Sequence, residues 1–424
     1  MLNSDRKKIA SGIMWWFATF GLILLTHLGV ETIAYYFLNS PIKGIFNPIL
    51  YEKDSLLFAN VIMPARGILF VFSLAILMYP VIAGVINQNL MGDSQILFKA
   101  IITTIILCII FTPGQLSGLA EEYSNTSLVM FSRQSSVSYN RRFLMPAIAH
   151  ILFFRGDFFF RVFSFILAFI FIFLILKWFK KNDVKTSLWQ VISLGTLSFV
   201  YFHLQVPGYP DVLVFIFIIL AFLFLDNTKI KLSLFVLSLA THEASLVIWA
   251  GLAFILFNKK EAVGFIIVSA LYVLIFIATT DDVFKSIALR GVGESSNITW
   301  IINYPEREVL GILLSFKGLW LIIVGAIWYS FNQKNTIQVL QILIVLFTGI
   351  TMTFLGVDTS RLFGWTFMVI LISWKILSTA NLSKLINTPL IINFLIPSVN
   401  VLLIMKPYFA FGIYSYVYQL FFGS

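Results

Sequence analysis

The sequence carries little charge and few residues of the types that bind metal ions. Only 11% of its 424 residues are charged and four are histidine, whereas 59% are hydrophobic. A soluble domain carries roughly a quarter charged residues, so this composition excludes an ordinary soluble protein. The single cysteine, Cys108, excludes a disulfide framework. The histidines are scattered, with no HExxH pattern and no cysteine pair, so no metal motif is predicted.

Other signatures of common enzymes are missing too. The chain has no P-loop and no glycine-rich dinucleotide fingerprint. No polar stretch exceeds roughly forty residues, which argues against a separate soluble domain. We predict no cofactor, with a divalent metal ion as an open alternative. The net charge of +10 does not predict a nucleic-acid partner here, because it must be interpreted by membrane side.

What the sequence has in abundance is apolar runs of about 18 to 25 residues, each long enough to cross about 30 Å of hydrocarbon. We therefore predict an all-α fold, a polytopic membrane bundle of about thirteen transmembrane helices that forms one integral membrane domain over 1–424. The first run follows MLNSDRKK without a small-residue cleavage site, which predicts a retained helix. The expected spans are 12–37, 61–86, 97–113, 162–178, 187–204, 211–226, 232–242 with 243–257, 262–279, 308–331, 336–355, 361–378 and 390–406.

Lysine-rich short loops set the expected orientation. By the positive-inside rule, the N-terminus and these loops are cytoplasmic, and the large loops 38–60, 114–161 and 280–307 are external. Lysine supplies nearly all positive charge on the predicted inner side, whereas arginine dominates the predicted outer loops. The lysine-rich loops are 177–185, 226–231, 258–261 and 332–335.

The outer stretch 121–161 concentrates the arginines. The guanidinium fork grips phosphate or carboxylate in bidentate fashion, so external arginines indicate an anionic ligand. Interfacial snorkelling with local acids is the alternative interpretation. We favour the ligand, because Arg141 and Arg142 are adjacent and precede an amphipathic helix. The arginines of this stretch are Arg133, Arg141, Arg142, Arg155 and Arg161.

The segment Phe143–Phe154 predicts that short helix. Pro146 suits a first turn, and about twelve residues are too few to span a membrane. We expect a surface or re-entrant helix within the outer loop 114–161. His150 lies on it and is a candidate ligand-binding residue, although a lone histidine is more often structural.

Two further polar positions interrupt apolar runs. Asp211 opens a helix after Pro210, where its carboxylate either caps amides or serves a site. The lysine-bounded stretch 232–257 is too short for two full crossings, which predicts two partial helices that meet near His242 and Glu243. Paired ionisable residues at such a turn are costly in lipid and indicate a functional site. One long tilted helix, or a purely structural His–Glu pair, are the alternatives.

Asp358 and Arg361 form the last cluster, in GVDTSRLFGW. They are either an i,i+3 ion pair or part of the same outer site. The chemistry of the whole set therefore rests on carboxylates and arginines. A carboxylate can act as base toward an acceptor hydroxyl, and arginines can stabilise a departing phosphate.

Between about residues 97 and 378 the chain resembles the integral-membrane glycosyltransferases of the GT-C superfamily. The features that carry the resemblance are the acids Glu121 and Glu122 at the start of a long outer loop, YNRRFLMP, Pro210–Asp211, the half-length hairpin with His242–Glu243, and DTSR. The resemblance implies a GT-C-like core at 97–378, preceded by two spans in 1–96 and followed by a C-terminal span and tail in 379–424. It also implies a lipid-linked sugar donor on a polyprenyl phosphate or diphosphate, a glycan acceptor, and a reaction at the external face of the bacterial inner (plasma) membrane.

The resemblance implies roles for individual residues. Glu121, Glu122 and Glu243 are the expected catalytic carboxylates, with Asp54 or Glu52 of the first loop as alternatives because the family's loop acid is usually Asp after the first span. The chain also resembles Wzy-type O-antigen polymerases, and a flippase or other transporter is a further alternative. Only one broken hairpin is apparent, which disfavours a transporter. The expected substrate-binding residues are Arg141, Arg142, His150, Asp211, His242, Asp358 and Arg361.

Overall fold

The computed structural model describes residues 12, 14–23, 63–87, 93–111, 116, 119–129, 142–279, 297–356, 358–400 and 408–409. Within these ranges the regular secondary structure is helical apart from one antiparallel pairing of two short strands, β1 (Val399–Asn400) and β2 (Tyr408–Phe409). The predicted all-α class is therefore confirmed.

The helices follow one another closely along the chain. Beyond the helical segment Met14–Ile23, they are α4 (Met63–Asn87), α5 (Ser94–Phe111), α6 (Leu119–Val129), α7 (Leu144–Ile151), α8 (Gly156–Lys181), α9 (Leu188–Gly195), α10 (Ser198–Gln205), α11 (Asp211–Leu223), α12 (Thr228–Thr241), α13 (Ser245–Leu256), α14 (Lys259–Thr279), α16 (Asn297–Asn303), α17 (Pro305–Phe316), η3 (Lys317–Leu319), α18 (Trp320–Asn332), α19 (Thr336–Thr353), α20 (Thr359–Phe363), η4 (Gly364–Thr366), α21 (Met368–Thr379) and α22 (Lys384–Leu395).

Several of these helices are long and apolar enough to cross a membrane, as expected for a multi-pass membrane protein. Among the described residues there are 5 such helices, or up to 6 if the pair Thr359–Thr366 and Met368–Thr379, bent by 45°, is one span. The predicted thirteen crossings are not confirmed. Many expected spans are divided into helices of 8 to 14 residues, shorter than the roughly 20 residues that a straight crossing needs.

Breaks within the apolar runs are more numerous than the sequence indicated. The expected span 187–204 is two helices, α9 and α10, separated at Thr196 and Leu197. The expected span 308–331 is interrupted by η3 at Lys317, whose φ is 48°, although Pro305–Asn332 as a whole is long enough to cross a membrane. The two breaks meet, because the Lys317 ammonium donates a 2.8 Å hydrogen bond to the carbonyl oxygen of Thr196. Buried backbone groups at a break need such partners in lipid. The apolar runs therefore contain helix breaks in addition to the predicted hairpin.

The predicted hairpin itself is confirmed. α12 ends at Thr241 and α13 begins at Ser245. A hydrogen bond between the two outer ends shows that the chain folds back. The ammonium of Lys231, in the first turn of α12, donates at 2.8 Å to the carbonyl oxygen of Leu256 at the end of α13. The same ammonium pairs with Glu261 at 2.7 Å. His242 and Glu243 therefore occupy the tip of a re-entering pair of helices.

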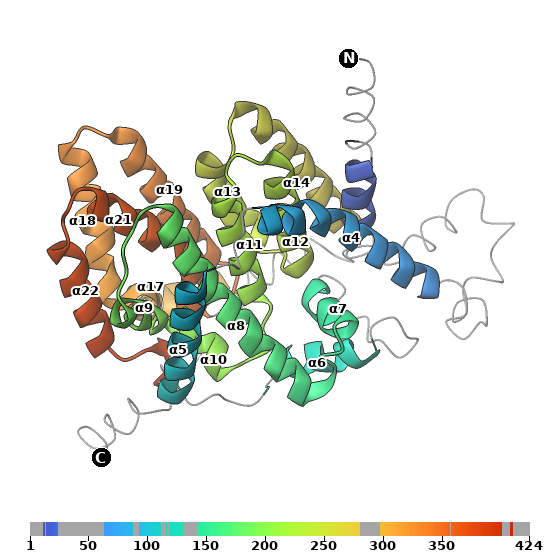
Figure 1. The fold of residues 1–424 in the computed structure, drawn as a ribbon, viewed down its shortest axis with the longest axis horizontal. Helices are drawn as coiled ribbons and strands as arrows, with labels where there is room; N and C mark the ends of the chain where they lie inside the picture. The colour runs from blue at the N-terminus through green and yellow to red at the C-terminus, as the bar shows by residue number, and fades with distance from the viewer. Residues whose placement is uncertain are drawn as a thin grey trace, which may run out of the picture.

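A cluster of aromatic rings supports this tip from inside the bundle. Figure 1 shows α11 and α12 in the middle of the molecule, with α18, α21 and α22 on one side and α6 and α7 on the other. The ring of Phe215, one turn after Asp211 on α11, is at the centre of the cluster. It packs, with centroid distances from 5.3 to 5.8 Å, against Phe171, Phe199, His203, Trp365 and Phe367. Such rings fill the core tightly and hold neighbouring helix ends in register.

Candidate functional site

A cavity of about 420 Å³ opens beside the tip of the α12–α13 hairpin. Its polar end is formed by Arg142, His242, Glu243 and Arg361, and apolar side chains form the rest of its wall. A concave, mainly apolar cavity with a few convergent polar groups is the usual form of a small-molecule site. The sequence positions that supply its polar end are separated by more than two hundred residues, and the fold brings them together.

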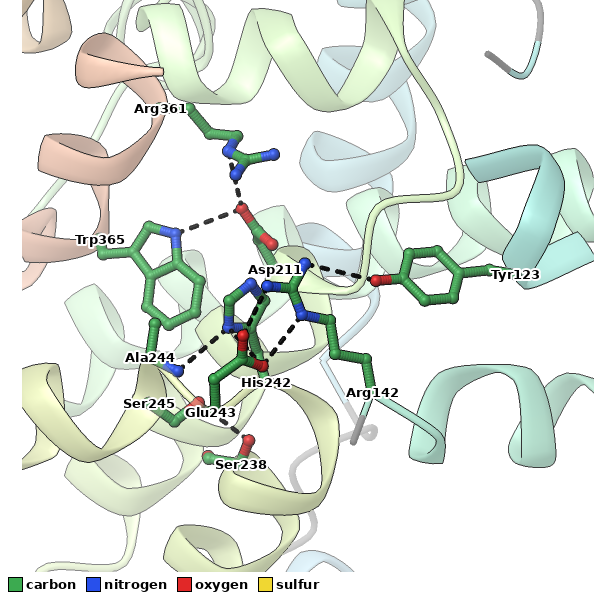
Figure 2. A network of polar contacts seen from close by, with 10 residues as sticks. All are labelled: Tyr123, Arg142, Asp211, Ser238, His242, Glu243, Ala244, Ser245, Arg361 and Trp365. Atoms are coloured by element: carbon green, nitrogen blue, oxygen red, sulfur yellow. Dashed lines mark hydrogen bonds and ion pairs between the residues drawn. The ribbon is translucent and has the colours of Figure 1, made fainter. Parts of the chain in front are cut away.

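Arg142 and Glu243 form the first of two ion-pair groups at this end. The guanidinium donates through Nε to Oε2 at 2.9 Å and through Nη2 to Oε1 at 2.6 Å, the parallel geometry that makes an arginine–carboxylate pair strong. A longer bond, 3.4 Å, runs from Nη1 to the hydroxyl of Tyr123 on α6 (Figure 2). Burial lowers the pKa of Arg142, but the charge of Glu243 more than offsets this and the pKa is well above its usual range. Burial has the opposite effect on the hydroxyl of Tyr123 and raises its pKa to about 12. Both Arg142 and Tyr123 therefore stay protonated at neutral pH.

His242 presents a defined face to the cavity. Its Nδ1 accepts a hydrogen bond from the backbone amide of Ala244 at 3.1 Å, and the same nitrogen lies 3.6 Å from Oε2 of Glu243. An Nδ1 that accepts a bond carries no proton, so a neutral ring holds its proton on Nε2. The ring also packs edge-on against Trp365, at 5.1 Å between centroids. His242 therefore offers a fixed N–H donor.

The second ion-pair group is centred on Arg361 of α20. Its Nε lies 3.4 Å from Oδ2 of Asp211 and 3.5 Å from Oδ2 of Asp358. Trp365 donates through Nε1 to the same Oδ2 of Asp211 at 3.2 Å, so Arg361 and Trp365 converge on one carboxylate (Figure 2). The guanidinium carbon lies 5.1 Å and 5.0 Å from the ring centroids of Phe202 and Tyr209, within the range of cation–π attraction. These contacts fix the orientation of a planar cation at the cavity wall.

Some polar atoms of this group are left without partners. Nε of Arg361 makes no hydrogen bond to any residue that the structure describes, and Oδ1 of the fully buried Asp211 has none either. Buried polar groups are normally satisfied, so each exception calls for an explanation such as a ligand or water. Two arginines and three carboxylates meet here, with donors and acceptors both available. Such a mixture suits a ligand that carries both an anion and hydroxyl groups.

The structure brings together six of the residues that the sequence indicated. For two of them, Asp211 and Asp358, it also shows whether the carboxylate caps a helix or pairs with Arg361. Asp211 does not cap its helix with its side chain but pairs with Arg361 and Trp365. Asp358 both caps α20 and pairs with Arg361, so the local interpretation of that pair holds alongside the site. The six residues are Arg142, Asp211, His242, Glu243, Asp358 and Arg361.

Other expected residues lie apart from this group. Glu121 and Glu122 are exposed on α6 and make no ion pair within the described ranges, whereas the opposite face of α6 carries the buried Tyr123. The helix therefore turns Tyr123, and neither glutamate, toward Arg142. His150 lies near the end of α7, where Nδ1 is 2.7 Å from the carbonyl oxygen of Ser127. Arg141, Glu52 and Asp54 lie outside the described residues.

Three contributors were missed from the sequence. No pattern in the sequence separates Tyr123 and Trp365 from the chain's many other aromatic residues, and only their contacts with Arg142 and Asp211 distinguish them. Glu308 was passed over in the loop-to-helix stretch PEREVLG. Its position three residues before Gly311, on the same helix face, was the available signal, since small residues let helices approach closely.

No group of three or more His, Cys, Asp or Glu side chains that could hold a metal ion occurs in the described parts of the chain. Comparisons with known proteins add no further assignment. The chain matches no family model, and neither a curated protein nor a solved structure is found to be similar to it.

Proposed function

We propose that this protein is an integral-membrane glycosyltransferase of the bacterial inner (plasma) membrane. In this proposal it moves a sugar from a polyprenyl-phosphate or polyprenyl-diphosphate donor onto a surface glycan, at the external face. The observation that carries the proposal is Arg361, which Asp211 and Asp358 hold at the wall of a cavity that is charged at one end and apolar along the rest.

The donor's chemistry suits this division of the cavity. Its phosphate needs planar or charged donors, which Arg361 and the N–H of His242 supply. Its isoprenoid chain needs an apolar surface, which residues such as Leu246, Val247 and Phe354 supply. A free sugar nucleotide would leave that apolar surface unused. The cavity therefore favours an amphiphilic donor with an anionic head.

The carboxylates then have a second task. Glu243 is the one carboxylate among the described cavity-lining residues, and Arg142 holds it in a fixed position. A donor phosphate that competes for Arg142 frees the oxygens of Glu243 to accept the proton of an acceptor hydroxyl. In this proposal Arg361 holds the phosphate and stabilises the charge that develops as the sugar leaves. Glu121 and Glu122 remain the alternative bases, on the neighbouring helix α6.

A deletion strain complemented with variants tests this function. Loss of one branch sugar from the surface glycan identifies a transferase, whereas loss of chain length identifies a polymerase of the Wzy type. Arg361→Lys should fail to restore the glycan at normal protein level, and Arg307→Lys should restore it. Arg307 is a matched control, because it also lies over a tyrosine ring, that of Tyr304 at 4.2 Å, but does not line the cavity. An unchanged glycan in the deletion strain would overturn the proposal.

A lipid transporter is the second candidate, and one observation favours it. Broken helices are common in transporters, and here breaks occur at Thr196, Lys317 and the α12–α13 tip. The two functions differ in one measurable respect. A transporter moves the labelled lipid across a vesicle membrane with its sugar still attached, whereas a transferase separates the sugar from the lipid.

A further inference from the structure

Glu308 occupies an unusual place beside the site. It lies in the first turn of α17 and is only 8% exposed, yet it makes no ion pair with any residue in the described part of the chain. A buried carboxylate without a cation needs hydrogen-bond donors. Two hydroxyls provide them. Thr353 donates to Oε1, and Thr359 donates to Oε2 at 2.8 Å.

The positions of the two threonines give these bonds their significance. Thr353 is the last residue of α19 and Thr359 is the first residue of α20, so one carboxylate holds both ends of the connection between these helices. This connection contributes Phe354, Leu355 and Gly356 to the cavity wall. It ends at Asp358, which pairs with Arg361.

The rest of the same face of α17 reinforces the attachment. A Cβ atom added to Gly311 would lie 2.6 Å from the Thr359 side chain, so only glycine permits this approach of α17 to α20. One turn further on, the hydroxyl of Ser315 donates to the carbonyl oxygen of Ser360 at 2.9 Å. Glu308, Gly311 and Ser315 thus form a continuous seam of small and polar residues against α20.

We propose that Glu308 is a positioning residue that clamps the end of α19 to the start of α20 through Thr353 and Thr359 and thereby sets the place of Asp358 and Arg361 at the cavity. The clamp itself is argued only from the hydrogen bonds of Glu308 to Thr353 and Thr359. Its effect on donor binding rests on the proposed function. A loosened connection populates arrangements in which Arg361 is out of place. Apparent affinity then falls in proportion to the fraction that stays competent.

Thr359 offers the cleanest variants. The Thr353 hydroxyl also lies 2.7 Å from the carbonyl oxygen of Ile350, so its single proton is shared, whereas Thr359 bonds Glu308 alone. Thr359→Val removes the hydroxyl at nearly constant volume, and Thr359→Ser retains it. Thr351→Val is the matched control on α19, because that hydroxyl bonds only to its own helix, at Phe347. Glu308→Gln tests the other side of the bond.

The first measurement follows the connection directly. Cys108 is the only cysteine, so a Cys108→Ser background with Leu355→Cys gives one reporter at the cavity wall. Thr359→Val and Glu308→Gln should speed maleimide labelling of the reporter by about fivefold, the equivalent of one hydrogen bond. Thr359→Ser and Thr351→Val should label at the parent rate. Equal labelling in all variants would overturn the clamp, as would a lower melting temperature with unchanged labelling.

The second measurement follows the ligand in the protein without the reporter. Polyprenyl phosphate in nanodiscs should bind Thr359→Val with a Kd raised by about the same fivefold factor, and Thr359→Ser with the parent Kd. If Thr359→Val labels faster but binds polyprenyl phosphate with an unchanged Kd, the claim that Glu308 sets the position of Arg361 is wrong. If the parent protein itself binds no polyprenyl phosphate while labelling responds as expected, the clamp stands and the proposed function fails.

Discussion

Replacing Arg361 with lysine keeps the positive charge and removes the planar fork. In the structure the guanidinium lies between two carboxylates and about 5 Å from the rings of Phe202 and Tyr209, so its plane is fixed on several sides. Lysine offers a single nitrogen, and an ammonium that pairs with Asp211 cannot also reach into the cavity as two parallel donors. The loss expected is that of one charge-assisted hydrogen bond, about 1.5–3 kcal/mol, or roughly a 10- to 150-fold weaker Kd for the phosphate head.

The assay is equilibrium binding of polyprenyl phosphate to purified protein in nanodiscs, with a neutral polyprenol as the reference ligand. Arg361→Lys should weaken binding of the phosphate and leave the weaker binding of the polyprenol unchanged. Arg307→Lys should alter neither. If Arg361→Lys binds the phosphate as tightly as the parent protein does, Arg361 does not contact it, and the interpretation of the cavity as an anion site is wrong.

Further predictions concern the neighbouring residues and the orientation. Tyr123→Phe removes one long bond to Arg142 and should reduce transfer by at most about fivefold, measured as kcat/KM. Glu243→Gln leaves a buried guanidinium unpaired and should cost about 3–5 kcal/mol of stability in chemical denaturation, whereas the double change with Arg142→Gln should cost less than the sum of the two single changes. Additive losses would show that the pair is not coupled. Reporter fusions at Lys259 and Lys334 should be cytoplasmic, and an external signal at Lys259 would contradict the hairpin.

The sequence predicted the tip of the hairpin and most of the charged group because charge is rare in this chain. An ionisable residue in an apolar run is costly in lipid, so His242, Glu243, Asp211 and Arg361 stood out without any knowledge of the fold. Their pairing was not predictable. Arg142 and Glu243 are 101 residues apart, and no local pattern indicates which arginine meets which acid. Glu121 is exposed because of the way α6 packs against its neighbours, and the hydropathy of α6 does not reveal that packing.

The breaks in the helices could not be predicted for a similar reason. Apolar runs such as 187–204 show no proline or charge at the point where they divide. The break at Thr196 depends on Lys317, 121 residues later, whose ammonium satisfies the freed carbonyl. Hydropathy measures only whether a segment prefers lipid, and it is blind to such long-range partners. It therefore predicted single spans where the described chain has shorter, divided helices.

Reconstituted transfer tests the central proposal most directly. Purified protein in proteoliposomes is given a polyprenyl-phosphate or polyprenyl-diphosphate sugar, labelled in the sugar, together with glycan from the deletion strain, and the products are resolved by mass spectrometry. The account predicts labelled sugar on the glycan and free lipid phosphate, both absent with Arg361→Lys and both present with Arg307→Lys. Labelled lipid that crosses the membrane intact, with no sugar on the glycan, would contradict it.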